Sequence, residues 1–396
     1  MHELLPRNRI EYVVRRLGNA PVVGIFGPRQ VGKTTLVRDL LPALYARPIH
    51  YLDLEDPRDF QKLEDPASYL SAFSEHTVVI DEVQSRPELF ERLRPIIDAQ
   101  RTPGRFVLLG SVSPTVVRGV SESLAGRIAH VELAPINRLE LPDRIGQVEH
   151  WMRGGYPNSL FAANDRDSAE WREDYIRSYV TRDLPSLRKE VDAQLATRLL
   201  TMCAHASGEM LNATSISKSL GVSQPTVKGY LRLLESSYLV RLLQPYHANL
   251  KKRLVRTPKL YLRDSGLANY LLRLRDFDEV AGYYKSGSLW EGYVVEQVFT
   301  AIARDFQRDI YFYRTGSGNE LDLVIAPRPD RVVTAEIKLN NAPVLPKGYY
   351  AAREDLKPVK SYIVTPEQRE TYVDGNGSIV IGLRPFLEQL AHDPFG

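Results

Sequence analysis

Cysteine is almost absent from this 396-residue chain, which contains one, Cys203. A single cysteine excludes an internal disulfide and a cysteine-based zinc site. The residues just before it, Leu199, Leu200 and Met202, are apolar. We therefore expect Cys203 to be a small core residue rather than a nucleophile.

Long hydrophobic runs are also missing. No apolar stretch approaches the length needed to span a bilayer, and Met1–Arg7 lacks the apolar core of a signal peptide. We therefore expect a cytoplasmic protein with no membrane partner. The net charge is only +3, so composition alone gives no sign of nucleic-acid binding and any basic surface must be local. Internal repeats and low-complexity linkers are lacking too, so domain borders follow from changes in pattern.

What the sequence does contain is a glycine-rich phosphate-binding loop. It follows the apolar run Val22–Phe26 and precedes a helical pattern, which is the strand, loop and helix order that such a loop requires. Its two glycines let several backbone N–H groups converge on one anion at a helix N-terminus. We expect Lys33 to neutralise the β- and γ-phosphates of ATP and Thr34 to ligate Mg²⁺. The predicted nucleotide-binding residues are Gly27, Pro28, Arg29, Gln30, Val31, Gly32, Lys33, Thr34 and Thr35.

Two further apolar runs end in polar residues. Thr77–Ile80 leads into Asp81 and Glu82, as a buried parallel strand does when it delivers acids to the carboxyl edge of a sheet. We expect Asp81 to hold Mg²⁺ through water and Glu82 to orient or deprotonate the attacking water. An ordinary strand end is the alternative. Phe106–Leu109 leads to Ser111, our candidate for sensing the γ-phosphate.

Strands alternate with helices over residues 1–135, which is typical of a parallel sheet wound on both faces. The predicted strands are Val22–Phe26, His50–Leu54, Thr77–Ile80, Phe106–Leu109 and Ala129–Leu133. We therefore predict an α/β ATPase core of the P-loop type in residues 1–135. Residues 136–190 are mostly helical in pattern, and we expect them to form a lid on the nucleotide.

Residues 191–263 have the pattern of a winged helix-turn-helix. A helix capped by Asn212 or Thr214 stops at Gly221, and a second helix restarts with Pro225 in its first turn. Two short helices joined by a glycine turn are a helix-turn-helix. The expected wing strands are Tyr238–Leu243 and Lys259–Leu262.

This module also carries the local basic stripe that the net charge conceals. Between Ser223 and Arg263 there are nine Lys or Arg and one Glu, including the cluster Lys251–Arg253. Such a stripe suits the phosphate backbone of DNA. The alternative is a module that packs against the ATPase core or contacts another protein.

Residues 264–396 form a third α/β pattern, in which charged residues interrupt apolar segments. Asp322 opens an apolar strand, while Glu336 and Lys338 share one face of the next strand. Buried charges are costly unless they bind something. We expect Asp322 and Glu336 to hold Mg²⁺, Lys338 to position a water for phosphodiester hydrolysis, and Glu296, on the preceding helix, to complete the metal shell. A solvated strand edge is the alternative, and cleavage itself stays open.

Together these motifs resemble a prokaryotic family of AAA-type ATPases, related to archaeal ATPases of the STAND class, with a C-terminal restriction-endonuclease-like, PD-(D/E)xK domain. The motifs that carry the resemblance are Gly27–Thr35, Asp81–Gln84, Leu124–Arg127, Gly154–Pro157, Tyr179–Asp183, Leu260–Leu267, Trp290–Glu296, Glu320–Asp322 and Glu336–Lys338. The resemblance implies ATP and Mg²⁺ binding and a nuclease-type fold. It also implies a γ-phosphate contact for Arg127, for which a structural salt bridge is the alternative. Val112 departs from the family pattern, which leaves the sensor role to Ser111 or Ser113.

Three functions remain open from the sequence. The first is an ATP-dependent DNA-processing protein in which nucleotide state controls the winged helix and a metal-dependent nuclease. The second is an ATP-driven switch whose C-terminal domain binds DNA or protein without cleavage. The third is a signalling scaffold in which the winged helix binds a protein. The oligomeric state, a homo-oligomer included, also stays open.

Overall fold

The chain forms two compact units. The structure, a computed structural model, describes residues 5–113, 124–188, 191–247, 254–302, 304–328, 330–342, 344–367 and 370–395. Unit 1 comprises Met1–Ile136 with Ser236–Tyr238, and unit 2 comprises Asn137–Glu235 with Leu239–Gly396. Within the described ranges, no helix is both long and apolar enough to cross a membrane.

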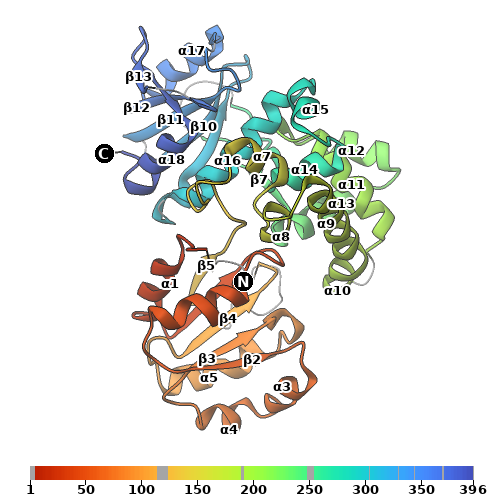
Figure 1. The fold of residues 1–396 in the computed structure, drawn as a ribbon, viewed down its shortest axis with the longest axis vertical. Coiled ribbons are helices and arrows are strands. Elements are labelled where there is room, and N and C mark those ends of the chain that lie inside the picture. Colours follow the sequence, from red (N-terminus) through yellow and green to blue (C-terminus); the bar gives the residue numbers. More distant parts are fainter. Residues whose placement is uncertain are drawn as a thin grey trace. The chain divides into compact units, whose positions relative to one another are not determined.

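Unit 1 is built on a five-stranded sheet in which all neighbouring strands are parallel (Figure 1). Its strands are β1 (Val22–Phe26), β2 (Ile49–Asp53), β3 (Thr77–Asp81), β4 (Phe106–Gly110) and β5 (Ile128–Glu132), in the order β2-β3-β4-β1-β5. The central strands β1, β3 and β4 are buried along their whole length, as their apolar runs require. The predicted parallel sheet is confirmed, with each strand within one residue of its expected position.

Helices precede and connect these strands. They are α1 (Ile10–Leu17), α2 (Lys33–Thr35), η1 (Leu36–Leu40), η2 (Leu41–Ala43), α3 (Pro57–Lys62), α4 (Pro66–Ser71), η3 (Val83–Ser85) and α5 (Leu89–Ala99). α3 and α4 begin where Asp56 and Asp65 accept backbone hydrogen bonds, each with a proline in the first turn. Because the strands are parallel, the carboxyl ends of β1, β3 and β4 meet at one edge of the sheet.

The first helices of unit 2 pack on a helix that lies more than 80 residues later in the chain. They are α7 (Gln147–Arg153), α8 (Pro157–Leu160), α9 (Asp165–Ser178), η4 (Tyr179–Asp183) and α10 (Leu184–Leu187), and α7 and α9 contact α14 (Ser265–Leu271). Asp264 caps α14 by accepting from Leu267 N at 2.9 Å, and it also accepts from Gly155 N at 2.8 Å. A Cβ on Gly154 would lie 2.2 Å from Asp264 Oδ1, so glycine at position 154 is needed for this close approach. The motifs Gly154–Pro157 and Leu260–Leu267 thus contact each other through Asp264. The role of residues 136–190 as a lid on the nucleotide stays a prediction.

The middle of unit 2 contains three helices and a small antiparallel sheet. The helices are α11 (Ala193–His205), α12 (Ala213–Leu220) and α13 (Gln224–Ser236), and the strands, in the order β6-β8-β7, are β6 (Glu209–Met210), β7 (Val240–Leu243) and β8 (Lys259–Leu262). Asn212 caps α12 by accepting from Ser215 N at 2.9 Å, and Gly221 ends that helix with a φ of 70°. Thr214 is therefore not the cap.

The end of unit 2 is a six-stranded mixed sheet. Its strands are β9 (Ile310–Arg314), β10 (Glu320–Arg328), β11 (Arg331–Ile337), β12 (Lys360–Thr365), β13 (Tyr372–Val373) and β14 (Ile379–Gly382), in the order β13-β14-β12-β11-β10-β9. β9, β10 and β11 are antiparallel neighbours, whereas β11, β12 and β14 are parallel neighbours. The helices here are α15 (Phe277–Gly282), α16 (Ser286–Ala301), η5 (Arg304–Asp309), α17 (Lys347–Leu356) and α18 (Leu383–His392).

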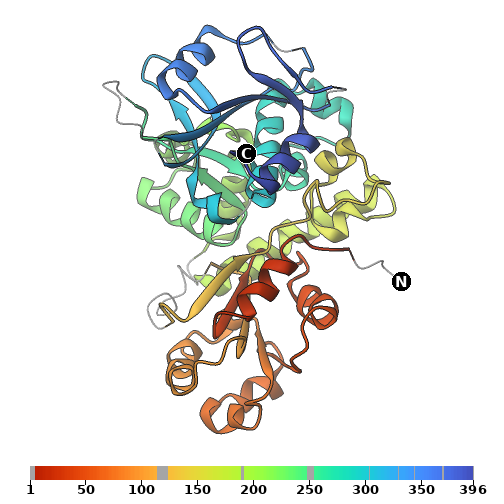
Figure 2. The ribbon, with the colours of Figure 1, turned by 90° about the vertical axis from the view of Figure 1, so that its left-hand side faces the viewer.

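Alternate residues of β10 and β11 belong to two different cores. Leu323 and Val333 pack with residues of α16 and α18, whereas Val324 and Val332 pack with residues of α17. Figure 2 shows this sheet in blue, with α17 on its upper side and α18 on its lower side. Helices therefore cover both faces of the strands that carry Asp322 and Glu336.

Candidate functional site

The phosphate-binding loop leaves β1 at the carboxyl edge of the sheet in unit 1. Gly32 has a φ of 93° and Gln30 a φ of 62°, a conformation that favours glycine. A Cβ on Gly27 would lie 2.0 Å from the Leu133 carbonyl oxygen, so only glycine fits there. Leu36 N donates to Gly32 O at 2.9 Å, which starts the helix directly behind the loop. The strand, loop and helix order predicted from the sequence is therefore present.

Lys33 is buried inside this loop. Its ammonium donates to the carbonyl oxygens of Gly27 at 3.0 Å and Pro28 at 2.8 Å. Burial lowers the pKa of Lys33 to about 8, although the nearby carboxylates of Glu82 and Asp81 oppose that shift. A buried ammonium held only by neutral carbonyls is available to an incoming anion.

Arg7 supports the loop from the segment before α1. Its guanidinium donates to the backbone oxygens of Val31 at 2.8 Å and Ala134 at 2.6 Å. The loop is thereby tied to the residues that follow β5. Sequence reasoning did not identify Arg7, because an isolated arginine far from the loop carries no pattern of its own.

Asp81 and Thr34 meet at the same edge of the sheet. Thr34 Oγ1 donates to Asp81 Oδ2 at 2.9 Å, and the hydroxyl of Tyr51 donates to the same oxygen. Burial, reinforced by the Asp81 hydrogen bond, raises the pKa of Tyr51. The two residues predicted to ligate Mg²⁺ are therefore side by side, so they fit that ion. Tyr51 was missed, since a tyrosine within β2 looks like any other strand residue.

Gln84 joins Glu82 to Ser111. Glu82 has a φ of 54°, unusual for a residue other than glycine, and the Gln84 amide donates to its carboxylate. The same amide group donates to Ser111 Oγ at 3.0 Å, and Ser111 N donates to Gln84 Oε1 at 3.3 Å. Burial raises the pKa of Glu82, while Lys33 opposes the shift. Ser111 thus lies beside the predicted catalytic carboxylate, linked to it through Gln84.

Arg127 lies at the opposite edge of the sheet. It forms a bidentate ion pair with Asp98 of α5, in which Nε lies 2.8 Å from Oδ1 and Nη2 lies 2.7 Å from Oδ2. Ile128, the next residue, pairs with Val22 at the start of β1, whereas the loop follows the end of that strand. The structure therefore shows the salt-bridge alternative, and Arg127 does not reach the loop of its own chain.

A second group of charges lies in unit 2, where β10 and β11 run side by side. Ile337 N donates to Asp322 Oδ2 at 2.9 Å, and the Lys338 ammonium donates to Glu336 Oε1 at 2.7 Å. Glu336 Oε2 is buried and has no hydrogen-bond partner among the residues that the structure describes. Burial raises the pKa of Glu336, and the neighbouring carboxylate of Asp322 raises it further. The predicted proximity of these three side chains is thus observed.

Glu296 is not part of this group. Its carboxylate is paired with Arg241 and Arg263, and its distance to the Arg263 Nε atom is 3.1 Å. The carboxylate that α16 does contribute is Glu291, whose pKa is raised by burial although Lys259 opposes the shift. The predicted metal role of Glu296 is therefore wrong. We call Glu291, Glu320, Asp322 and Glu336 the carboxylate cluster.

Lys259 of β8 lies within the carboxylate cluster. Its buried ammonium is 2.7 Å from Glu291 Oε1, 2.7 Å from Glu320 Oε1 and 3.6 Å from Asp322 Oδ1. In the described ranges, no group of three or more His, Cys, Asp or Glu side chains is arranged to hold a metal ion. The carboxylate cluster therefore does not fit the predicted Mg²⁺ in this arrangement.

The basic stripe of the middle module is also smaller than its sequence suggests. Lys251–Arg253 lies outside the described residues. Of the other six Lys and Arg residues, Arg241, Arg263 and Lys259 are occupied by the ion pairs just described. The basic residues that remain exposed are Lys228, Arg232 and Arg256.

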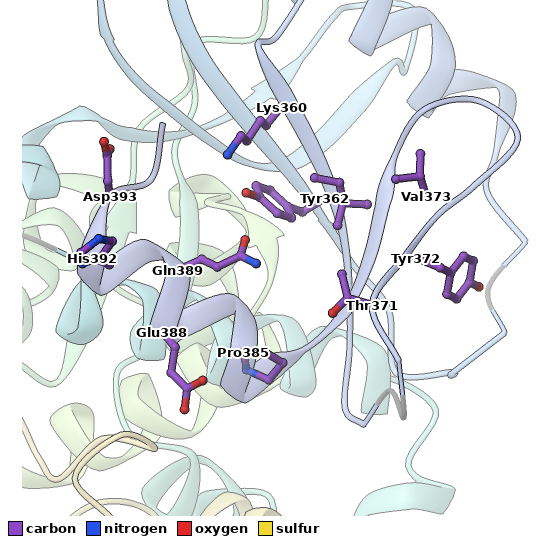
Figure 3. Close-up of a pocket in the computed structure, with 11 residues that line it drawn as sticks. Lys360, Tyr362, Thr371, Tyr372, Val373, Pro385, Glu388, Gln389, His392 and Asp393 are labelled. Atoms are coloured by element: carbon purple, nitrogen blue, oxygen red, sulfur yellow. The ribbon is translucent and has the colours of Figure 1, made fainter. Parts of the chain in front are cut away.

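A surface pocket lies beside β12, β13 and α18 (Figure 3). Lys360 and Tyr362 of β12, Tyr372 of β13, and Glu388 and His392 of α18 line part of it. None of the predicted site residues lines this pocket.

Comparison with known proteins agrees with the geometry of the loop. Residues 19–141 match a family described as an AAA domain, and residues 146–278 and 286–386 match two families described as domains of unknown function. Over 356 residues the chain is 38% identical to an uncharacterized protein of Mycobacterium tuberculosis. This match covers 89% of this chain and 78% of the mycobacterial protein. A protein of Mycobacterium bovis matches to the same extent. The chain belongs to the family of these mycobacterial proteins.

Unit 1 of this family member is thus an ATP-binding, AAA-type domain, as the resemblance implied. Among solved structures, a Walker-type ATPase of Pyrococcus abyssi is 16% identical with a TM-score of 0.46, and the match covers 68% of this chain and 96% of that one. The restriction-endonuclease-like character of the C-terminal domain stays a prediction.

Proposed function

We propose that this protein hydrolyses ATP at the loop of unit 1. The observation that carries the proposal is the convergence of four side chains at one edge of the sheet. Thr34 lies 2.9 Å from Asp81, and the charges of Asp81 and Glu82 both act on Lys33. Such a group, next to a backbone cradle for phosphate, is what phosphoryl transfer to water needs.

Each side chain has one role in this proposal. Lys33 turns from the carbonyl oxygens of Gly27 and Pro28 to the phosphates, where its charge is better stabilised. Thr34 and Asp81 would hold Mg²⁺, which supplies positive charge to the phosphates when bound. Tyr51 must release the Asp81 carboxylate for that purpose.

Glu82 acts on the water. Its carboxylate accepts a proton as the water oxygen bonds to the γ-phosphorus, and the bond to the bridging oxygen breaks with ADP as the leaving group. Burial raises the pKa of Glu82 and so makes it a stronger base than an exposed glutamate. Gln84, which also bonds to Ser111, holds this carboxylate in position, and Ser111 would respond to the γ-phosphate.

The test is phosphate release from Mg²⁺-ATP by the wild-type protein and by Glu82→Gln. We expect Glu82→Gln to bind ATP with unchanged affinity and to release phosphate at least roughly 100-fold more slowly than the wild type. Glu88→Gln is the matched control, because Glu88 lies on the same segment but pairs with Arg86. Equal turnover in wild type and Glu82→Gln would remove Glu82 from the mechanism.

A second candidate function is DNA contact controlled by the nucleotide. In this proposal residues 136–190 are the lid, residues 191–263 the winged helix-turn-helix, and residues 264–396 a nuclease-like domain that binds without cutting. The observation that favours DNA contact is the exposure of Lys228 and Arg232, four residues apart and thus on one face of α13. Because Lys259 occupies the carboxylate cluster, we favour a C-terminal domain that binds DNA without cleaving it.

Salt dependence tests this second function. If Lys228 and Arg232 contact phosphates, their joint replacement by alanine in the full chain should reduce the salt slope of duplex DNA binding by about two. Lys62→Ala in unit 1 is the control, because Lys62 pairs with Asp59. Absent or salt-insensitive binding by the wild type would favour a protein partner for this module.

A further inference from the structure

The carboxylate cluster already contains a cation, which the chain itself supplies. Lys259 projects from β8 and lies 2.7 Å from an oxygen of Glu291 and 2.7 Å from an oxygen of Glu320. The Tyr261 hydroxyl, two residues further along β8, donates to the same oxygen of Glu291. β8 therefore makes two polar contacts with one carboxylate of α16.

The surroundings leave Lys259 almost no access to solvent. The side chain is 3% exposed, and its ammonium lies 5.5 Å from the centre of the Phe312 ring. Burial alone lowers the pKa of Lys259, but the carboxylates, Glu291 first among them, outweigh burial and shift the pKa upward. Lys259 is thus held as a charged group, with its partners fixed on two other segments.

The cluster is not fully satisfied by this lysine. Asp322 is 3.6 Å from the ammonium, and Glu336 pairs with Lys338, the residue that follows β11. Glu336 Oε2 is buried, with no hydrogen-bond partner in the described part of the chain. A buried oxygen of a carboxyl group without a partner is costly, and a divalent cation between Asp322 and Glu336 would supply one.

We propose that the Lys259 ammonium occupies the carboxylate cluster in place of a metal ion. A divalent cation then binds there only when Lys259 has been withdrawn or removed. The lysine comes from β8 of the small antiparallel sheet, whereas Asp322 and Glu336 lie on the C-terminal sheet. A movement of β8 away from the C-terminal sheet would therefore withdraw the Lys259 ammonium from the carboxylate cluster, and the reverse movement would return it. The ATPase proposal does not depend on this inference.

Binding of Mn²⁺ to the nucleotide-free full chain tests the inference. Wild-type protein should show no Mn²⁺ site that is lost in Glu336→Gln. Lys259→Met replaces the lysine by an apolar side chain of similar length. This variant should gain one Mn²⁺ site, with an affinity at least about tenfold higher than that of the same carboxylates in the wild-type protein. Adding Glu336→Gln to Lys259→Met should abolish that site and so distinguish it from the nucleotide loop.

Lys285→Met is the matched control, because Lys285 also pairs with a glutamate of unit 2, Glu209, but lies outside the cluster. It should gain no site. A folded Lys259→Met protein without a new site would overturn the inference. Should that variant fail to fold, the wild-type measurement still decides, because Mn²⁺ binding that Glu336→Gln removes would show that Lys259 does not close the cluster.

Discussion

Two buried lysines, one in each unit, have opposite electrostatic surroundings. Lys33 is held by two neutral carbonyl oxygens, and burial lowers its pKa to about 8. Lys259 is held by carboxylates, which shift its pKa upward despite burial. The difference teaches how surroundings set the role of one residue type. A lysine whose ammonium donates to carbonyl oxygens, with carboxylates only nearby, is available to an anion from solution, whereas one paired directly with carboxylates is already neutralised.

The largest effect should come from removing the lysine that has counter-ions. Lys259→Met leaves buried carboxylates without their cation, so we expect unfolding free energy to fall by about 3–5 kcal/mol. Lys33→Met removes a charge that the nucleotide-free fold disfavours, so its unfolding free energy should not fall. Chemical denaturation of both variants measures the difference. Equal losses in the two variants would show that the two lysines have equivalent surroundings.

Nucleotide binding should reverse that order. Lys33→Ala removes the charge that meets the phosphates, and we expect ATP affinity to fall at least about 100-fold. Lys259→Met should keep wild-type affinity wherever it is folded, since Lys259 lies in the other unit. Titration calorimetry with a non-hydrolysable ATP analogue checks both. Ordinary affinity in Lys33→Ala would defeat the assignment of the loop.

The lowered pKa of Lys33 predicts a pH dependence of nucleotide binding. Above a pH of about 8, the nucleotide-free protein must take up a proton at Lys33 to bind phosphate. Affinity should therefore fall as pH rises through 8, by up to about tenfold per pH unit. For folding the sign is opposite. Between pH 8 and 10.5 the unfolded chain binds more protons at this residue, so its contribution to stability rises with pH.

Calorimetry from pH 7 to 9.5 measures this dependence. A flat affinity profile over that range would show that Lys33 is charged in the nucleotide-free protein at every pH tested.

The smallest effect should come from Arg127. Because its partner is Asp98 of α5, in a solvent-screened ion pair, Arg127→Ala should change the unfolding free energy only slightly. ATP turnover by the loop of the same chain should stay unchanged. Steady-state kinetics with thermal unfolding checks both, and a large loss of turnover would indicate that Arg127 acts on a neighbouring copy of the chain.

The sequence predicted those parts of the fold that depend on local pattern. The loop, the strand ending in Asp81 and the parallel sheet all follow from short segments with fixed spacing, and the structure contains them. The placement of Glu336 and Lys338 on one face followed from strand alternation, and the two side chains are hydrogen-bonded in the structure. Thr34 and Asp81 were predicted to work together because parallel strands share a carboxyl edge.

Features that depend on helix orientation or on distant segments were not predictable. Glu291 and Glu296 are five residues apart on α16, so they point to different sides of a helix that is buried around most of its surface. Lys259 looked like one more charge in a basic stripe, because nothing in its own segment indicates that β8 lies against α16. Tyr51 and Arg7 likewise depend on contacts between segments that only the fold brings together.

The most direct test of the central claim is the titration of the two lysine ammonium groups by NMR, with ¹³C-labelled lysine and Lys33→Met and Lys259→Met for assignment. Without nucleotide, Lys33 should titrate near pH 8, and Lys259 should stay charged over the same range. Adding Mg²⁺ and a non-hydrolysable ATP analogue should shift the Lys33 titration to higher pH and leave Lys259 unchanged. A Lys33 titration that the analogue does not move would show that no phosphate binds at this loop.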